Sequence, residues 1–291
     1  MHETAGGRRR FAEEVRSDRP DLSTVCLLIG AEADPGLDDA GLDAAQIELD
    51  RLAGQLPYAP GDGARGWALA LAELLGTRHG FRGSPGDYRR LESSLLHRVL
   101  FDRRGLPILL SVVWLEVARR AGAPVYGVAL PGHFVVGFDD PGAPGAPVGL
   151  GAVGKPGGPV LADPFSGGRL LTGPDTETLV RVATGSTLGR SMVAPAEPLD
   201  ITLRILNNIR AWAAARPERT DVQLWAVELA LLLPSHPARL RYERAQLLVR
   251  RGDFLSGAAA LDSYAEVVEA VDPAAAESVR REAVAARALL N

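Results

Sequence analysis

Residues 104–122 read RGLPILLSVVWLEVARRAG. Apolar side chains occupy nearly every position of 108–117, so a helix formed here must be covered on all sides by other elements. Pro107 stands where the first helical residue would be, which suits its fixed φ and missing N–H. Arg119 and Arg120 would lie in the last turn, where cations interact favourably with the helix dipole. The stretch therefore predicts a central, buried helix.

Short strands follow this helix, and two of them carry polar side chains. A tight Pro-Gly turn separates the first two strands, and a Gly/Pro-rich surface loop at 139–159 precedes the third. His133 opens the second strand and Asp163 lies near the end of the third. The predicted strands cover 124–130, 133–138 and 160–165.

The order of helix, His133 and Asp163 matches the plan of a papain-type catalytic site. In such a site the start of the helix lowers the pKa of a thiol, a histidine takes the thiol proton, and a carboxylate orients the imidazole. Here the helix start reads Leu106-Pro107-Ile108 and contains no thiol. The sequence thus predicts a His–Asp pair that lacks the cysteine it would serve.

Four pieces of sequence around this site occur together in one known family. They are RGLPILLS at 104–111, EVARRAG at 116–122, PGHF at 131–134 and DPFSGG at 163–168. The set resembles the SirB-one family of transglutaminase-like proteins. The resemblance extends back through Phe81-Arg82-Gly83 to the helix with Cys26, and forward to about residue 290 through tetratricopeptide-like helices.

The resemblance implies a transglutaminase-like core in which His133 and Asp163 match the histidine and aspartate of the family. The chain departs from active transglutaminase-like enzymes at the helix start, where those enzymes carry cysteine. It also has Ser93-Ser94 where similar proteins tend to have Asn-Ser.

The domain organisation follows from the sequence pattern, which becomes wholly helical near residue 196. Residues 1–20 are polar and are predicted to be a flexible N-terminal tail; residues 21–195 would form the transglutaminase-like domain. Residues 196–291 predict helical hairpins that must stack to bury their apolar faces. The predicted fold class is α+β: a papain-type domain with a small antiparallel sheet packed on a central helix, then an all-α helical-repeat domain.

Ser111 is the serine to consider as a substitute nucleophile, because it lies one helical turn after Pro107. The alternative is a buried hydroxyl that bonds to the carbonyl four residues earlier. His133 and Asp163 also have structural alternatives, as a buried histidine and as a turn-initiating aspartate before proline. The residues we expect to bind a ligand are Arg103, Arg104, Pro107, Ile108 and Gly132; the two arginines adjoin free helix N–H groups, or are simply solvated.

Composition limits the function classes. The formal net charge of −4 argues against a nucleic-acid-binding surface, and no apolar run is long enough to cross a membrane. The single cysteine, Cys26, is expected to be buried, and one cysteine permits no intramolecular disulfide. His97 and His133 lack a third ligand at suitable spacing, so we expect no metal site and no cofactor.

Three function hypotheses remain open from the sequence. The first is a non-catalytic or weakly catalytic protein, cytoplasmic, that binds a peptide or small ligand in the old cleft and a protein partner through the helical tail. The second is a hydrolase or acyltransferase that uses Ser111 with His133 and Asp163. The third is a scaffold in which the His–Asp pair only stabilises the fold.

Overall fold

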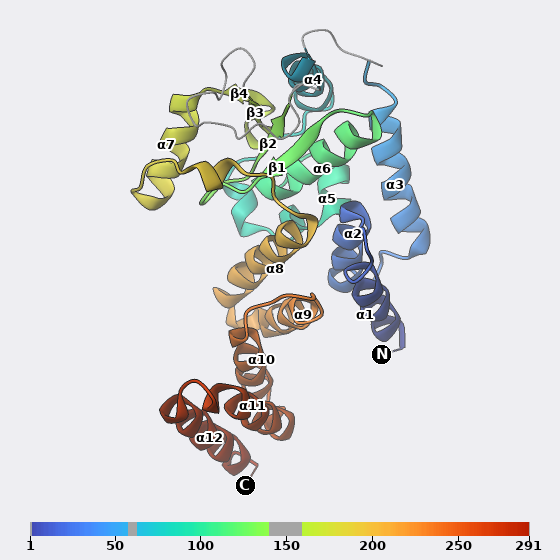
Figure 1. The fold of residues 1–291 in the computed structure, drawn as a ribbon. Coiled ribbons are helices and arrows are strands. Elements are labelled where there is room, and N and C mark those ends of the chain that lie inside the picture. Colours follow the sequence, from blue (N-terminus) through green and yellow to red (C-terminus); the bar gives the residue numbers. More distant parts are fainter. Residues whose placement is uncertain (1, 58–62, 140–158, 291) are drawn as a thin grey trace. The chain divides into compact units, whose positions relative to one another are not determined.

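The computed structural model describes residues 2–57, 63–139 and 159–290 (Figure 1). The predicted loop at 139–159 falls almost entirely outside these residues. The chain divides into two compact units. One unit is Pro20–Ile205; the other joins Met1–Arg19 to Leu206–Asn291.

The unit Pro20–Ile205 contains the predicted central helix, α6 (Pro107–Arg120), which begins at Pro107 as expected. Every α6 residue from Pro107 to Ala118 is buried. Helices on one side and strands β1 and β2 on the other cover it (Figure 1). The other helices of this unit are α2 (Leu22–Ala33), α3 (Asp39–Ala53), α4 (Gly63–Leu71) with a π-helical continuation (Ala72–Arg78), α5 (Leu96–Asp102) and α7 (Gly173–Thr184).

The sheet of this unit has four antiparallel strands in the order β1-β2-β3-β4. The fourth strand was not predicted; it forms because the Gly167-Gly168 turn, with both residues at positive φ, returns the chain along β3. His133 was expected inside a strand, but β2 starts two residues later. The strands are β1 (Val125–Val128), β2 (Val135–Phe138), β3 (Val160–Asp163) and β4 (Arg169–Leu171).

A buried carboxylate, Glu116, lies near the C-terminal end of α6. Glu116 is 1% exposed, and both Arg119 and Arg120 pair with its carboxylate, at 2.6 and 2.5 Å. Arg120 also donates to the Gln46 side chain on α3, at 2.6 Å. Because a buried carboxylate is costly without partners, these arginines have a structural role beyond the helix dipole.

The second unit is entirely helical in its described residues. Its helices α9 to α12 follow one another along the chain, and α10, α11 and α12 pack in sequence (Figure 1). Alanine dominates the buried cluster that joins these last three helices. The elements are α9 (Thr220–Ala230), α10 (Arg239–Arg250), α11 (Phe254–Glu269) and α12 (Pro273–Ala288); α8 (Pro198–Ala214) contains the division between the units.

The N-terminal segment differs from its prediction as a flexible tail. It forms α1 (His2–Glu14) and belongs to the all-helical unit. Phe11 and Val15 are each 1% exposed, and Arg8 pairs with Glu228 of α9 at 2.6 Å. The polar composition concealed this helix, because the buried apolar side chains that the structure describes in this segment are Phe11 and Val15, four residues apart.

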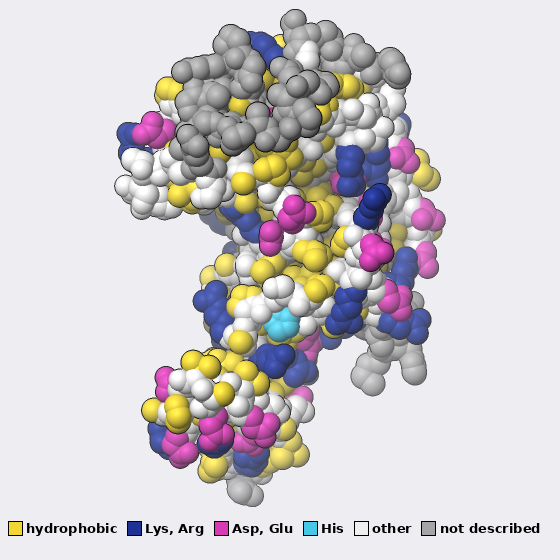
Figure 2. All heavy atoms as spheres, in the orientation of Figure 1, with side chains coloured by type: hydrophobic (Ala, Val, Ile, Leu, Met, Phe, Trp, Pro, Cys, Tyr) yellow, Lys and Arg dark blue, Asp and Glu magenta, His cyan; other side chains and the backbone are white. Residues whose placement is uncertain are grey.

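Charged side chains are interspersed on the face of the molecule drawn in Figure 2. Over the C-terminal helices basic and acidic groups alternate, and many of them pair, such as Arg280 with Glu269 and Arg210 with Glu243. Within the described residues, no helix is both long and apolar enough to cross a membrane.

Candidate functional site

His133 lies in the connection between β1 and β2, and Asp163 is the last residue of β3. β2 and β3 are antiparallel neighbours, with Val136 opposite Ala162. The start of β2 therefore lies beside the end of β3, which brings the turn before β2 next to Asp163. Gly132, at φ +70°, supplies the left-handed backbone that this turn requires.

The predicted pair is formed. His133 Nε2 lies 2.9 Å from Asp163 Oδ1, and the two side chains are 13% and 5% exposed. An ionised Asp163 can only accept, so the Nε2 proton is the one donated. Nothing among the described residues hydrogen-bonds to His133 Nδ1. Nδ1 is thus the nitrogen that would face a nucleophile or a ligand.

Asp163 is held by three donors. Besides His133, the Phe165 N–H donates to Oδ1 at 3.0 Å and the Ser166 hydroxyl to Oδ2 at 2.7 Å. Burial raises the pKa of Asp163, but the hydrogen bonds and charge of His133, with Ser166 and Phe165, outweigh it, so the pKa is lowered from 3.8. Asp163 is therefore a carboxylate at neutral pH and can orient the imidazole.

Two glycines allow the DPFSGG segment to reach this position. Gly83 lies against the Phe165 ring so closely that a Cβ would be 1.9 Å from a ring atom, and its N–H donates to the Phe165 carbonyl at 2.9 Å. Gly168 packs on Trp114 of α6, and its N–H donates to the Asp163 carbonyl at 2.8 Å. The FRG and DPFSGG motifs are thus parts of one packed structure.

Aromatic and cationic side chains that the sequence analysis missed surround the pair. The Phe165 ring meets the rings of His133 and Tyr88 edge-on, at 6.0 and 6.1 Å between centroids. Arg204 of α8 donates through Nη2 to the carbonyls of Leu130 and His133, both at 2.7 Å. The sequence could have indicated Arg204, because it is a lone cation beside the buried Ile201 and Ile205.

The residues expected at the start of α6 are buried or internally paired. Pro107 and Ile108 are buried. Arg103 pairs with Glu48 at 2.5 Å and lies over the Phe81 ring, while Arg104 pairs with Asp87 at 3.2 Å. Each guanidinium thus has a carboxylate partner within the protein.

Ser111 and Cys26 are both buried. Ser111 is 0% exposed, and its hydroxyl donates to the Phe134 carbonyl at 3.3 Å, not to the carbonyl four residues earlier. Cys26 on α2 is 2% exposed. Burial, together with the negative charges of Glu116 and Asp21, raises the pKa of its thiol, which keeps it protonated and unreactive.

Comparison with known proteins identifies the family. The family model of the transglutaminase-like superfamily matches residues 43–207, and a tetratricopeptide-repeat model matches residues 209–291. This chain belongs to the transglutaminase-like superfamily. The predicted architecture, a transglutaminase-like core followed by tetratricopeptide-like repeats, is confirmed, as is the α+β fold class.

Relatives of this transglutaminase-like protein occur in bacteria and in mammals. A UPF0162 protein of Xylella fastidiosa is 31% identical over 185 residues, which is 60% of each chain. A UPF0162 protein of Pseudomonas aeruginosa is 30% identical over 206 residues, 70% of this chain and 69% of the relative. F-box only protein 21 of Homo sapiens is 26% identical over 161 residues, 55% of this chain and 24% of the relative. The match thus spans about three fifths of the Xylella protein.

Metal ligation has no support in the part of the chain that the structure describes. No three His, Cys, Asp or Glu side chains there form a group that would hold a metal ion. The chemistry available at the pair consists of a partly exposed imidazole, a carboxylate that orients it, and the half-buried guanidinium of Arg204.

Proposed function

We propose that this protein is a non-catalytic or weakly catalytic member of its superfamily. It binds a peptide or small ligand beside His133 and Asp163 and a protein partner through its helical repeats. The observation that carries the proposal is the formed pair, at 2.9 Å, in a chain that has no thiol at the start of α6. The pair keeps the means to bind and orient a polar group but has no cysteine to activate.

Ser111 as the replacement nucleophile is disfavoured by its surroundings. A serine nucleophile needs an exposed hydroxyl within about 3 Å of the base. The Ser111 side chain is inaccessible and is hydrogen-bonded to the Phe134 carbonyl. These contacts support the structural role of Ser111 that the sequence left open.

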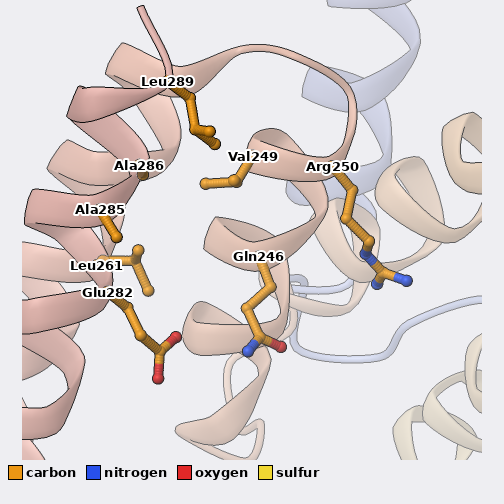
Figure 3. A pocket seen from close by; sticks show the side chains of 8 residues that line it. All are labelled: Gln246, Val249, Arg250, Leu261, Glu282, Ala285, Ala286 and Leu289. Carbon is orange, nitrogen blue, oxygen red and sulfur yellow. The ribbon is translucent and has the colours of Figure 1, made fainter.

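The tetratricopeptide-like repeats supply the second half of the proposal. A groove of about 600 Å³ opens between α10, α11 and α12, within the range of roughly 300–1,000 Å³ typical of ligand sites. Gln246 and Arg250 line one side and Glu282 the other, around an apolar floor (Figure 3). The mixture of apolar floor and polar rim suits a protein segment. The lining residues are Gln246, Val249, Arg250, Leu261, Glu282, Ala285, Ala286 and Leu289.

An activity screen with a matched set of variants tests the catalytic half. The purified protein would be given chromogenic esters, peptide amides and a glutamine-plus-amine pair, and would be labelled with a serine-directed fluorophosphonate. We expect no turnover above background and no label on Ser111. His133→Ala should therefore leave every signal unchanged.

Turnover at a rate typical of enzymes, about 1 s⁻¹ or more, that disappears in His133→Ala would overturn the proposal in favour of a hydrolase or acyltransferase. The control is His79→Ala, because His79 bonds to Gln55 outside the pair. Activity lost equally in both variants would indicate a contaminant or unfolding. Fluorophosphonate labelling lost in Ser111→Ala would identify Ser111 as the nucleophile.

A further inference from the structure

Arg204 is a half-buried cation whose charge has no carboxylate partner in the described structure. Its Nη2 donates to the Leu130 and His133 carbonyls, and the guanidinium lies 5.5 Å from the centre of the Phe134 ring. Burial lowers its pKa, and the one charge interaction that opposes this comes from Tyr88. Arginine has five N–H donors, so three remain after these two bonds. These three donate to no residue that the structure describes.

The charges of Asp163 and Arg204 both affect the pKa of Tyr88. Tyr88 is 51% exposed, and its ring meets Phe165 edge-on. Burial and the negative charge of Asp163 raise its pKa, while the positive charge of Arg204 opposes the rise. No partner for its hydroxyl is present in the described part of the chain. The hydroxyl is therefore a second free donor. Tyr88 and Arg204 both flank His133, since Tyr88 meets the Phe165 ring that in turn meets the His133 ring, and Arg204 donates to the His133 carbonyl.

We propose that Arg204 and Tyr88 form an anion-binding site next to His133, and that this site takes a carboxylate group of the ligand. This proposal rests on the proposed function, since it names the chemistry that the ligand presents. A desolvated guanidinium is stabilised most by a planar carboxylate, which accepts two parallel N–H bonds. The nearby Asp163 charge disfavours a dianion, so a monoanionic carboxylate fits better than phosphate.

Small probes can test this site without knowledge of the natural ligand. The Cε1–H signal of His133, assigned by its loss in His133→Gln, would be followed by NMR at constant pH and ionic strength. N-acetylglycine carries the carboxylate, N-acetylglycinamide is its neutral counterpart, and inorganic phosphate is the competing anion. We expect a saturable shift with N-acetylglycine and at least about tenfold weaker binding of the amide, the loss expected for one charge-assisted bond pair.

Variants assign the effect to the two side chains. Arg204→Gln should weaken N-acetylglycine binding about tenfold, and Tyr88→Phe by a few-fold. Tyr88→Phe removes no hydrogen bond of the described fold, so it stays informative if Arg204→Gln unfolds. Arg181→Gln is the matched control, because Arg181 is exposed on α7 and pairs with Glu177; it should bind as the parent does.

Several results would overturn the carboxylate site. These are equal binding of acid and amide, tighter binding of phosphate, no saturable shift with N-acetylglycine, or binding unchanged in both Arg204→Gln and Tyr88→Phe. If the probe binds equally well to both variants, a ligand site beside His133 remains possible, but Arg204 and Tyr88 do not form it. Turnover dependent on His133 would remove the non-catalytic function without affecting the anion site.

Discussion

The two units of this protein bury their interiors in opposite ways. The unit around α6 brings together large side chains from distant parts of the chain, such as Trp114, Phe81 and Phe134, each no more than 1% exposed. In the repeats, the buried cluster shared by α10, α11 and α12 consists mainly of alanines, and these helices contact their sequence neighbours. The first arrangement depends on close complementarity; the second depends on repetition and stacking.

This difference has a functional consequence. In the unit Pro20–Ile205 the catalytic-type pair and the core share residues, because Gly168 both packs on Trp114 and bonds to the Asp163 backbone. A packing defect there should reach His133. In the repeats the buried cluster of α10, α11 and α12 consists mainly of alanines and is formed by sequence neighbours, so a defect should remain local. Three substitutions test this contrast.

Gly168→Ala should give the largest effect. The new Cβ would lie 2.3 Å from a Trp114 ring atom, at φ +89°. Overpacking costs roughly 1–3 kcal/mol and the left-handed backbone roughly 1–2 kcal/mol, so we expect the free energy of unfolding to fall by about 3 kcal/mol. Urea unfolding followed by circular dichroism measures the change, and the His133 Cε1–H signal should move.

Gly167→Ala is the control for backbone strain alone. Gly167 also has positive φ, +69°, but a Cβ there would meet no atom within 4 Å. Its cost should be about 1–2 kcal/mol, with His133 unmoved. Equal losses for the two variants would show that contact with Trp114 contributes nothing, and the contrast between the units would fail.

Leu261→Ala tests the repeats, where the groove wall is already open. Leu261 is 2% exposed, and removing its side chain should cost about 2 kcal/mol, below the larger losses seen in closed cores. The buried thiol of Cys26, in the other unit, provides the readout. At the urea concentration at which the repeat helices of Leu261→Ala unfold, Cys26 should remain unlabelled by a thiol reagent. Simultaneous labelling would mean that the two units unfold together.

The sequence predicted those features that local patterns determine. Helix α6 followed from its apolar run and Pro107, and the His133–Asp163 pair followed from strand order and family motifs. What it missed depends on long-range contact. β4 forms only because Gly167 and Gly168 fold back along β3, α1 is fixed by Phe11 and Val15, and Arg204 reaches the site from a helix assigned to the tail. The periodicity of apolar residues within one segment does not indicate such contacts between distant segments.

Asp163→Asn should have a small effect on stability and the clearest pH dependence. The amide keeps the shape and one acceptor oxygen, so we expect a loss of about 1–2 kcal/mol near neutral pH, the value of a charge-assisted hydrogen bond. Asp163 has a lowered pKa in the folded protein, so its ionised form favours folding. That contribution is complete above the unfolded pKa near 3.8 and disappears as pH falls through the lower folded value.

The gap in unfolding free energy between parent and Asp163→Asn should therefore stay constant above about pH 5 and shrink progressively as the pH falls below 3.8. Denaturant unfolding at several pH values measures it, and Asp175→Asn serves as the exposed comparison. A gap that stays constant with pH would mean that the charge of Asp163 does not stabilise the fold. In that case the packing of Phe165 against Gly83, and not the charge of Asp163, would position the His133–Asp163 pair.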